Sequence, residues 1–237
     1  MIARAGLMLL ALSACQAPAE QGAAVARDRP GPFPKADRPV AKIVSSRWST
    51  EEARDRLREA DRVMAMAGIT PGMTVADIGA GEGYYTIRLA ARVGKDGRVL
   101  AQDVVPEVRD ALAERVNRER LDNVSVKLGE PADPKLPVNS FDRVLMVHMY
   151  HEIAEPYEFL WNLRPAVKAS GQVIVVDADR PTKDHGTPPD LLRCEFAAVG
   201  YAQVRFERMP QAGGYFAAFE PRGPRPEPRA ITSCRSQ

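Results

Sequence analysis

The sequence predicts an α/β fold, a doubly wound sheet of seven mostly parallel strands in a three-layer arrangement with helices on both faces. Two observations lead to this prediction. Short apolar runs alternate with stretches of helical apolar spacing between residues 50 and 199, which is typical of a parallel sheet. Two further strand-like runs, 202–209 and 215–220, flank the turn residues 211–214 and predict a closing hairpin that adds one antiparallel strand.

The individual elements follow from apolar periodicity and from turn residues. Ser49 and Glu52 form a capping box that predicts the start of the first helix, and Gly68 predicts its end. Helices are expected over residues 50–67, 84–93, 107–120, 156–169 and 189–199. Strands are expected over residues 73–78, 98–102, 124–128, 141–147 and 173–177, followed by the hairpin.

Two segments outside this pattern are rich in proline and charge. Residues 16–45 contain four closely spaced prolines, and residues 221–237 have a similar composition. Such stretches cannot bury an apolar core, so they are expected to be a disordered tether and a disordered tail. The folded domain is therefore expected to span residues 46–220.

The N-terminus has the features of an export signal. Arg4 provides a short positive region, and residues 5–12 form an apolar run too short to span a membrane. Residues 12–15, Leu-Ser-Ala-Cys, resemble the lipobox of bacterial lipoproteins, which implies lipidation of Cys15 after removal of the signal. Gln16 is not the aspartate that would suggest inner-membrane retention, so the periplasmic face of the outer membrane is expected. A mis-assigned start codon in a cytoplasmic protein is the alternative.

Charge and cysteine content limit the possible partners. The chain has 33 basic and 31 acidic residues, a formal net charge of +2, so no nucleic-acid partner is expected. A membrane is expected to be contacted only through the lipid anchor. The three cysteines form no metal-ligand spacing. Because the tail is expected to be disordered, Cys194 is expected to be a buried free thiol that does not pair with Cys234.

A glycine-rich loop follows the first predicted strand. Asp77 is followed by Gly79, Gly81 and Gly83, and a helix begins immediately afterwards. Glycines let the backbone turn sharply and let a ligand approach it closely. The dinucleotide fingerprint GxGxxG would need a glycine at position 84, which is Tyr84, so an NAD site is disfavoured. The acidic residue followed by GxGxG resembles motif I of the class I S-adenosylmethionine-dependent methyltransferases, which have a Rossmann-like fold.

Other segments extend this resemblance over roughly residues 60–180. Asp103 ends the second strand, where the resemblance implies a ligand to the ribose hydroxyls. Glu130 stands near the expected adenine position, for which Asp133 competes. The FDRV run at 141–144 and the segment 160–177 also resemble the family. The resemblance implies S-adenosylmethionine as the cofactor, with the carboxylate of Asp77 near its cationic groups and Tyr84 beside its methionine part.

The methyl acceptor is expected to bind after the fourth strand. His148, Tyr150, His151 and Glu152 follow that strand and are candidates to position the nucleophile or to remove its proton. Glu152 and His151 can equally cap the next helix. All three histidines, including His185, lie in predicted loops at this edge, but their spacing matches no known ligand pattern, so no metal is expected.

These observations favour a methyltransferase that acts on a small molecule by in-line methyl transfer. An exported module that binds an adenosyl ligand without turnover is the first alternative, because S-adenosylmethionine is made in the cytosol. An NAD-dependent oxidoreductase is a weaker alternative.

Overall fold

The computed structural model describes residues 31–43, 50–210 and 213–235. The predicted signal segment and Cys15 lie outside the described residues. Within the ranges that are described, no helix combines the length and the apolar character needed to cross a bilayer.

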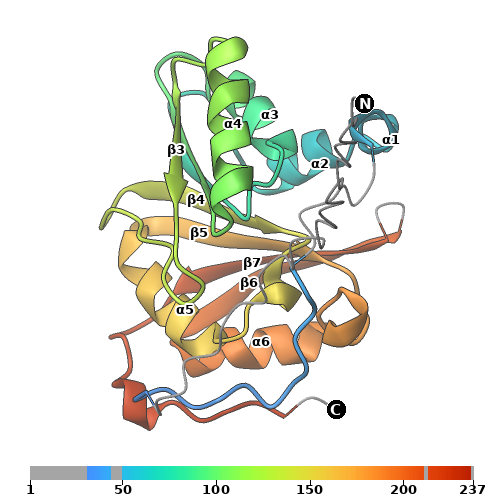
Figure 1. Ribbon diagram of the computed structural model, residues 1–237. Helices are drawn as coiled ribbons and strands as arrows, with labels where there is room; N and C mark the ends of the chain where they lie inside the picture. The colour runs from blue at the N-terminus through green and yellow to red at the C-terminus, as the bar shows by residue number, and fades with distance from the viewer. Residues whose placement is uncertain (1–30, 44–49, 211–212, 236–237) are drawn as a thin grey trace, which may run out of the picture.

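A seven-stranded sheet forms the centre of the molecule, in the order β3-β2-β1-β4-β5-β7-β6 (Figure 1). β1 to β5 are mutually parallel where they pair, and β7 runs antiparallel to both β5 and β6. This topology confirms the predicted fold class, and the strand order reverses between β1 and β4. The strands are β1 Thr74–Ile78, β2 Arg98–Asp103, β3 Val124–Leu128, β4 Phe141–Val147, β5 Val167–Asp177, β6 Tyr201–Met209 and β7 Gly214–Pro221.

Helices cover both faces of the sheet (Figure 1). Successive strand residues alternate between two apolar clusters: Val75 packs with α2 and α3, whereas Ala76 packs with α5 and α6. Val144 and Leu145 divide in the same way. This alternation is what a strand buried on both sides requires. The helices are α1 Glu51–Arg56, α2 Glu59–Met66, α3 Tyr84–Val93, α4 Pro106–Arg118, α5 Pro156–Leu163 and α6 Pro189–Ala198.

Two predicted helices differ from those observed. The helix expected over residues 50–67 is divided into α1 and α2 because Arg58 adopts a left-handed conformation, with φ of 52°. The helix expected over 156–169 ends at Leu163, since Pro165 has no N–H to continue the hydrogen-bond ladder. A short 3-10 turn follows, and β5 begins at Val167, earlier than expected.

The prediction of disorder is wrong for residues 31–43, which we call the N-terminal strap. The strap lies against the face formed by α5 and α6 (Figure 1). Arg38 is buried and its Nε donates to Glu195 Oε1 at 2.8 Å. Thr182 Oγ1 donates to the carbonyl of Pro39 at 2.5 Å. Prolines prevent a regular element here, but they do not prevent packing.

The C-terminal tail, residues 221–235, is also ordered, contrary to the prediction. Cys234 forms a disulfide with Cys194 of α6, so the expectation of a free thiol is wrong. A β-bridge joins Asp37 of the strap to Arg235 of the tail, and the two segments run side by side (Figure 1). Trp161 Nε1 donates to the carbonyl of Pro226 at 2.9 Å, which adds a contact to α5.

Candidate functional site

A pocket opens at the carboxyl ends of β1, β2 and β4. This is the point where the strand order reverses, the usual ligand position in open α/β sheets. The lining residues come from the glycine loop, the end of β2, the segment after β4, and the strap and α5: Ile43, Ile78, Gly79, Gly81, Gln102, Asp103, Val104, Val105, Pro131, Val147, His148, Met149, Glu152, Ile153, Ala154 and Phe159.

The three loop glycines have two different roles. Gly79 and Gly81 line the pocket with φ of 65° and 55°, a region that side chains rarely adopt. A Cβ on Gly79 would lie 3.0 Å from Met149, whereas one on Gly81 would meet no protein atom within 4 Å. Gly83 is outside the pocket lining and begins α3, where a Cβ would lie 2.5 Å from Leu112. Gly79 and Gly81 therefore shape the pocket wall, with open space for a ligand beside Gly81, and Gly83 leaves room for Leu112 of α4.

Asp103 connects the glycine loop to β2. Its Oδ2 accepts a hydrogen bond from the backbone N–H of Gly81 at 3.0 Å, and its Oδ1 accepts one from Val105 at 3.0 Å. The residue is mostly buried but lines the pocket. A carboxylate held in this way can still accept hydrogen bonds from a ligand, which fits the predicted role toward two adjacent hydroxyls.

Asp77 lies behind the loop and does not line the pocket. Its Oδ2 accepts a hydrogen bond from Thr86 Oγ1 at 2.6 Å. Burial raises the pKa of Asp77 to about 6, although the bond from Thr86 and the charge of Arg54 act against this. Asp77 can therefore act on a cationic ligand through its charge, without direct contact.

Tyr84 and Glu130 are not brought into the pocket. Tyr84 begins α3 and turns toward α1, where its hydroxyl donates to Asp55 at 2.9 Å and the Arg54 guanidinium lies 3.8 Å from the ring centre. Glu130 forms an ion pair with Lys135 at 3.3 Å, and its side chain is about half exposed. Pro131, the next residue, is the one that lines the pocket. The expected contacts of Tyr84 and Glu130 with a cofactor do not fit these positions.

His148 contributes an imidazole to the wall of the pocket that is formed by the segment after β4. It has a φ of 56° and a mostly buried side chain, and its Nε2 lies 3.4 Å from Glu59 Oε1. Glu59 Oε1 also accepts hydrogen bonds from Tyr85 and Arg54, at 2.9 and 2.7 Å. Burial alone would raise the pKa of Glu59, but His148 and Arg54 hold it at about 2. Glu59 is therefore an anion that can orient the imidazole.

Tyr150 and His151 are buried behind this wall. The Tyr150 hydroxyl donates to Glu195 Oε2 at 2.7 Å, and burial raises the pKa of Tyr150 well above its usual value. His151 Nδ1 lies 3.0 Å from Asp177 Oδ1. Neither side chain lines the pocket, so the predicted direct roles toward the acceptor fit His148 and Glu152 better. The short 3-10 turn after β4 directs Tyr150 and His151 inward.

Gln102 and Glu59 are site residues that sequence reasoning missed. Gln102 is buried beneath the pocket, and a Cβ on Gly129 would lie 1.6 Å from its Nε2. Gly129 therefore accommodates this amide, which is a signal that the sequence contained. Glu59 had no such signal, because an acidic residue in a helix is usually exposed.

Comparison with known proteins agrees with this geometry. Residues 75–180 match a family described as a methyltransferase domain. Nocamycin O-methyltransferase of Saccharothrix syringae is 41% identical over 86 residues, which are 36% of this chain and 30% of that protein. Demethylmenaquinone methyltransferase of Symbiobacterium thermophilum is 28% identical over 119 residues, 50% of this chain and 47% of that protein. The chain thus spans less than half the length of either relative.

A solved structure resembles more of the chain. The crystal structure of an S-adenosylmethionine-dependent methyltransferase from Aquifex aeolicus superposes with a TM-score of 0.64 and 28% identity, covering 70% of this chain and 90% of that one. The chain therefore has the Rossmann-like fold of these methyltransferases, its residues 75–180 match a methyltransferase domain, and both findings support S-adenosylmethionine as the cofactor.

Proposed function

We propose that the protein transfers a methyl group from S-adenosylmethionine to a small molecule bound in the pocket. One observation carries this proposal: the lining of a single pocket combines Gly79, Gly81 and Asp103 with His148 and Glu152. The first three residues suit a nucleoside with an adjacent cationic chain. The other two provide groups that can accept a proton at the place where an acceptor would lie.

The chemistry requires positioning more than activation. The nucleophile forms a bond to the methyl carbon while the carbon–sulfur bond breaks and its electron pair returns to sulfur. Holding the two reactants in line provides much of the rate. Where the nucleophile is a hydroxyl or thiol, its proton is taken by His148, which the anionic Glu59 orients.

Calorimetric titration of the purified chain tests the cofactor first. We expect micromolar binding of S-adenosylmethionine and none of NAD. Binding of NAD with no binding of S-adenosylmethionine would favour an oxidoreductase and contradict the proposal.

Release of S-adenosylhomocysteine then tests turnover against a panel of phenols, carboxylic acids, thiols and amines. With an accepted substrate, His148→Gln is expected to lower kcat by at least about 100-fold while the Kd for S-adenosylmethionine changes little. Glu59→Gln should shift the pH profile of kcat, because it removes the anion beside His148. Cofactor binding without any turnover would favour the non-catalytic binding module.

We also propose that the protein is exported and anchored through Cys15. The Cys194–Cys234 disulfide supports export, because disulfides persist in oxidising compartments and are rare in the cytosol. Cys15→Ser should release the protein from the membrane fraction of cells that express the full chain. A wild-type protein found in the soluble fraction would contradict the anchor.

A further inference from the structure

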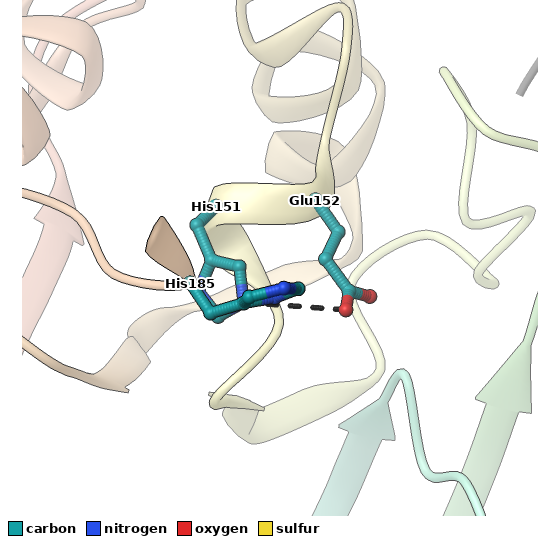
Figure 2. A group of neighbouring side chains, drawn as sticks. All are labelled: His151, Glu152 and His185. Carbon is teal, nitrogen blue, oxygen red and sulfur yellow. Dashed lines mark ion pairs between the residues drawn. The ribbon is translucent and has the colours of Figure 1, made fainter. Parts of the chain in front are cut away.

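Three potential metal ligands converge at the ends of β4 and β5. His151 and Glu152 belong to the 3-10 turn after β4, and His185 follows a turn after β5. One ligand atom from each lies within 4.8 Å of the other two. Figure 2 shows the two imidazole rings and the carboxylate directed toward one another. We call these three residues the His–Glu cluster.

The hydrogen bonds of His151 orient one nitrogen toward the cluster. Nδ1 lies 3.0 and 3.1 Å from the two oxygens of Asp177, which is fully buried. Asp177 also accepts hydrogen bonds from Thr187 Oγ1 and from the N–H of Ala178, both at 2.8 Å. These donors stabilise a carboxylate, so Nδ1 carries the proton that it donates to Asp177. In a neutral ring, Nε2 then presents a lone pair.

The lone pair on Nε2 of His151 faces the carboxylate of Glu152, which is also an electron-pair donor. Nε2 of His151 lies 4.0 Å from Glu152 Oε1, and the His185 ring lies 5.4 Å from the His151 ring, edge to face. Two electron-pair donors facing each other in a mostly buried position favour a positive charge between them. A carboxylate that holds Nδ1 of a histidine while Nε2 binds a metal is a common arrangement in metalloproteins.

The turn that carries His185 is held in place. Arg180 donates from Nε and Nη2 to the His185 carbonyl, at 3.1 and 3.0 Å. A Cβ on Gly186 would lie 2.6 Å from the carbonyl oxygen of Ala178, so only glycine fits beside the turn. The position of His185 is therefore set by the fold.

We propose that the His–Glu cluster binds a divalent transition-metal ion of the zinc type. Two imidazoles and one carboxylate suit Zn²⁺ and its neighbours, whereas Mg²⁺ and Ca²⁺ prefer oxygen ligands. Ligand atoms around tetrahedral zinc are roughly 3.3 Å apart, so small side-chain rotations close the observed spacing. Glu152 also lines the pocket, so the ion would lie in the pocket wall on the side of β5.

Metal binding can be measured whether or not methyl transfer occurs. The full chain is kept oxidised so that Cys194 and Cys234 cannot bind metal, stripped with a chelator, and titrated with Zn²⁺ by calorimetry and with Co²⁺ by visible absorption. We expect one ion per chain with a micromolar or lower Kd, a tetrahedral Co²⁺ spectrum, and no binding of Mg²⁺.

His185→Gln and Glu152→Gln should each weaken Zn²⁺ binding at least about tenfold, and we expect both variants to fold because the two residues are only partly buried. His148→Gln is the matched control, because it removes a nearby histidine outside the cluster and should leave Zn²⁺ affinity unchanged. Absence of Zn²⁺ binding to the wild type would overturn the proposal. Binding that survives both variants, or is lost in His148→Gln, would also overturn it.

Discussion

The two walls of the pocket are built in different ways. The cofactor wall, Gly79, Gly81 and Asp103, comes from the loop after β1 and from the end of β2, which a hydrogen bond from the backbone of Gly81 to Asp103 joins. The acceptor wall, His148 and Glu152, depends on side chains that are far away in the sequence. Glu59 stands beside His148, 89 residues earlier in the numbering. The cofactor wall thus belongs to one strand–helix–strand unit, whereas the acceptor wall depends on packing against a more distant part of the chain.

The largest expected effect on cofactor binding comes from a change that breaks the cofactor wall directly. Gly81→Val should weaken S-adenosylmethionine binding by at least about 100-fold, or ~2.7 kcal/mol, measured by calorimetry. The new side chain would enter the pocket and would strain a backbone with φ of 55°. Gly72→Val is the matched control, because Gly72 also has a positive φ and open space but precedes β1 at its other end. Equal losses in the two variants would show that strain alone explains the effect.

The next effect is on stability, and it concerns the disulfide between α6 and the C-terminal tail. Replacing both Cys194 and Cys234 with serine should lower the free energy of unfolding by about 4 kcal/mol, because the disulfide closes a loop with a sequence separation of 40. Urea unfolding measures this change. Reductant should destabilise the wild type and leave the double variant unaffected, while cofactor affinity stays constant in both. A loss of cofactor affinity on reduction would contradict the independence of the two regions.

A smaller effect tests the carboxylate that joins the loop to β2. Asp103→Ala should weaken S-adenosylmethionine binding at least tenfold, about 1.4 kcal/mol, in the same titration. Asp96→Ala removes an exposed acidic residue of the neighbouring turn, paired only with Lys95 at the surface, and should change nothing. Unchanged affinity in the Asp103 variant would remove this residue from the site.

The smallest effect is a pH dependence that arises from Asp77. Its pKa of about 6 means that roughly a quarter of the free protein carries the charged form at pH 5.5 and nearly all of it at pH 7.5. A cationic ligand favours the charged form, so affinity should fall about fourfold as the pH is lowered across this interval. Titrations of Asp77→Asn should be weaker but flat over the same range. A wild type with no pH dependence would show that the cofactor charge does not reach Asp77.

The difference between the two pocket walls also explains which features could be predicted from the sequence. α3, β3 and β4 were predicted with the observed bounds, since their apolar periods and flanking turn residues are local signals. Gly79, Gly81 and Asp103 were placed in the pocket for the same reason: conformational freedom and a strand-end carboxylate are visible in a few adjacent residues.

The inward direction of Tyr150 and His151 could not be predicted from local sequence. It depends on Glu195 and Asp177, which lie on α6 and at the end of β5. The order of the strap and tail was missed for a related reason. Proline content indicates that a segment lacks regular hydrogen bonding, but not whether a distant surface accepts it.

The ion pair between Arg38 and Glu195 also affects which fragments of this protein can be stable. Glu195 is fully buried and receives its positive partner from the strap, outside the residues that match the methyltransferase family. A fragment trimmed to the family match plus its last strands would leave a carboxylate in the interior without a counter-charge, a change that costs about 3–5 kcal/mol. It would also lose Cys234. The segments that stabilise the fold therefore extend beyond the residues that match the methyltransferase family, and include the strap and the tail.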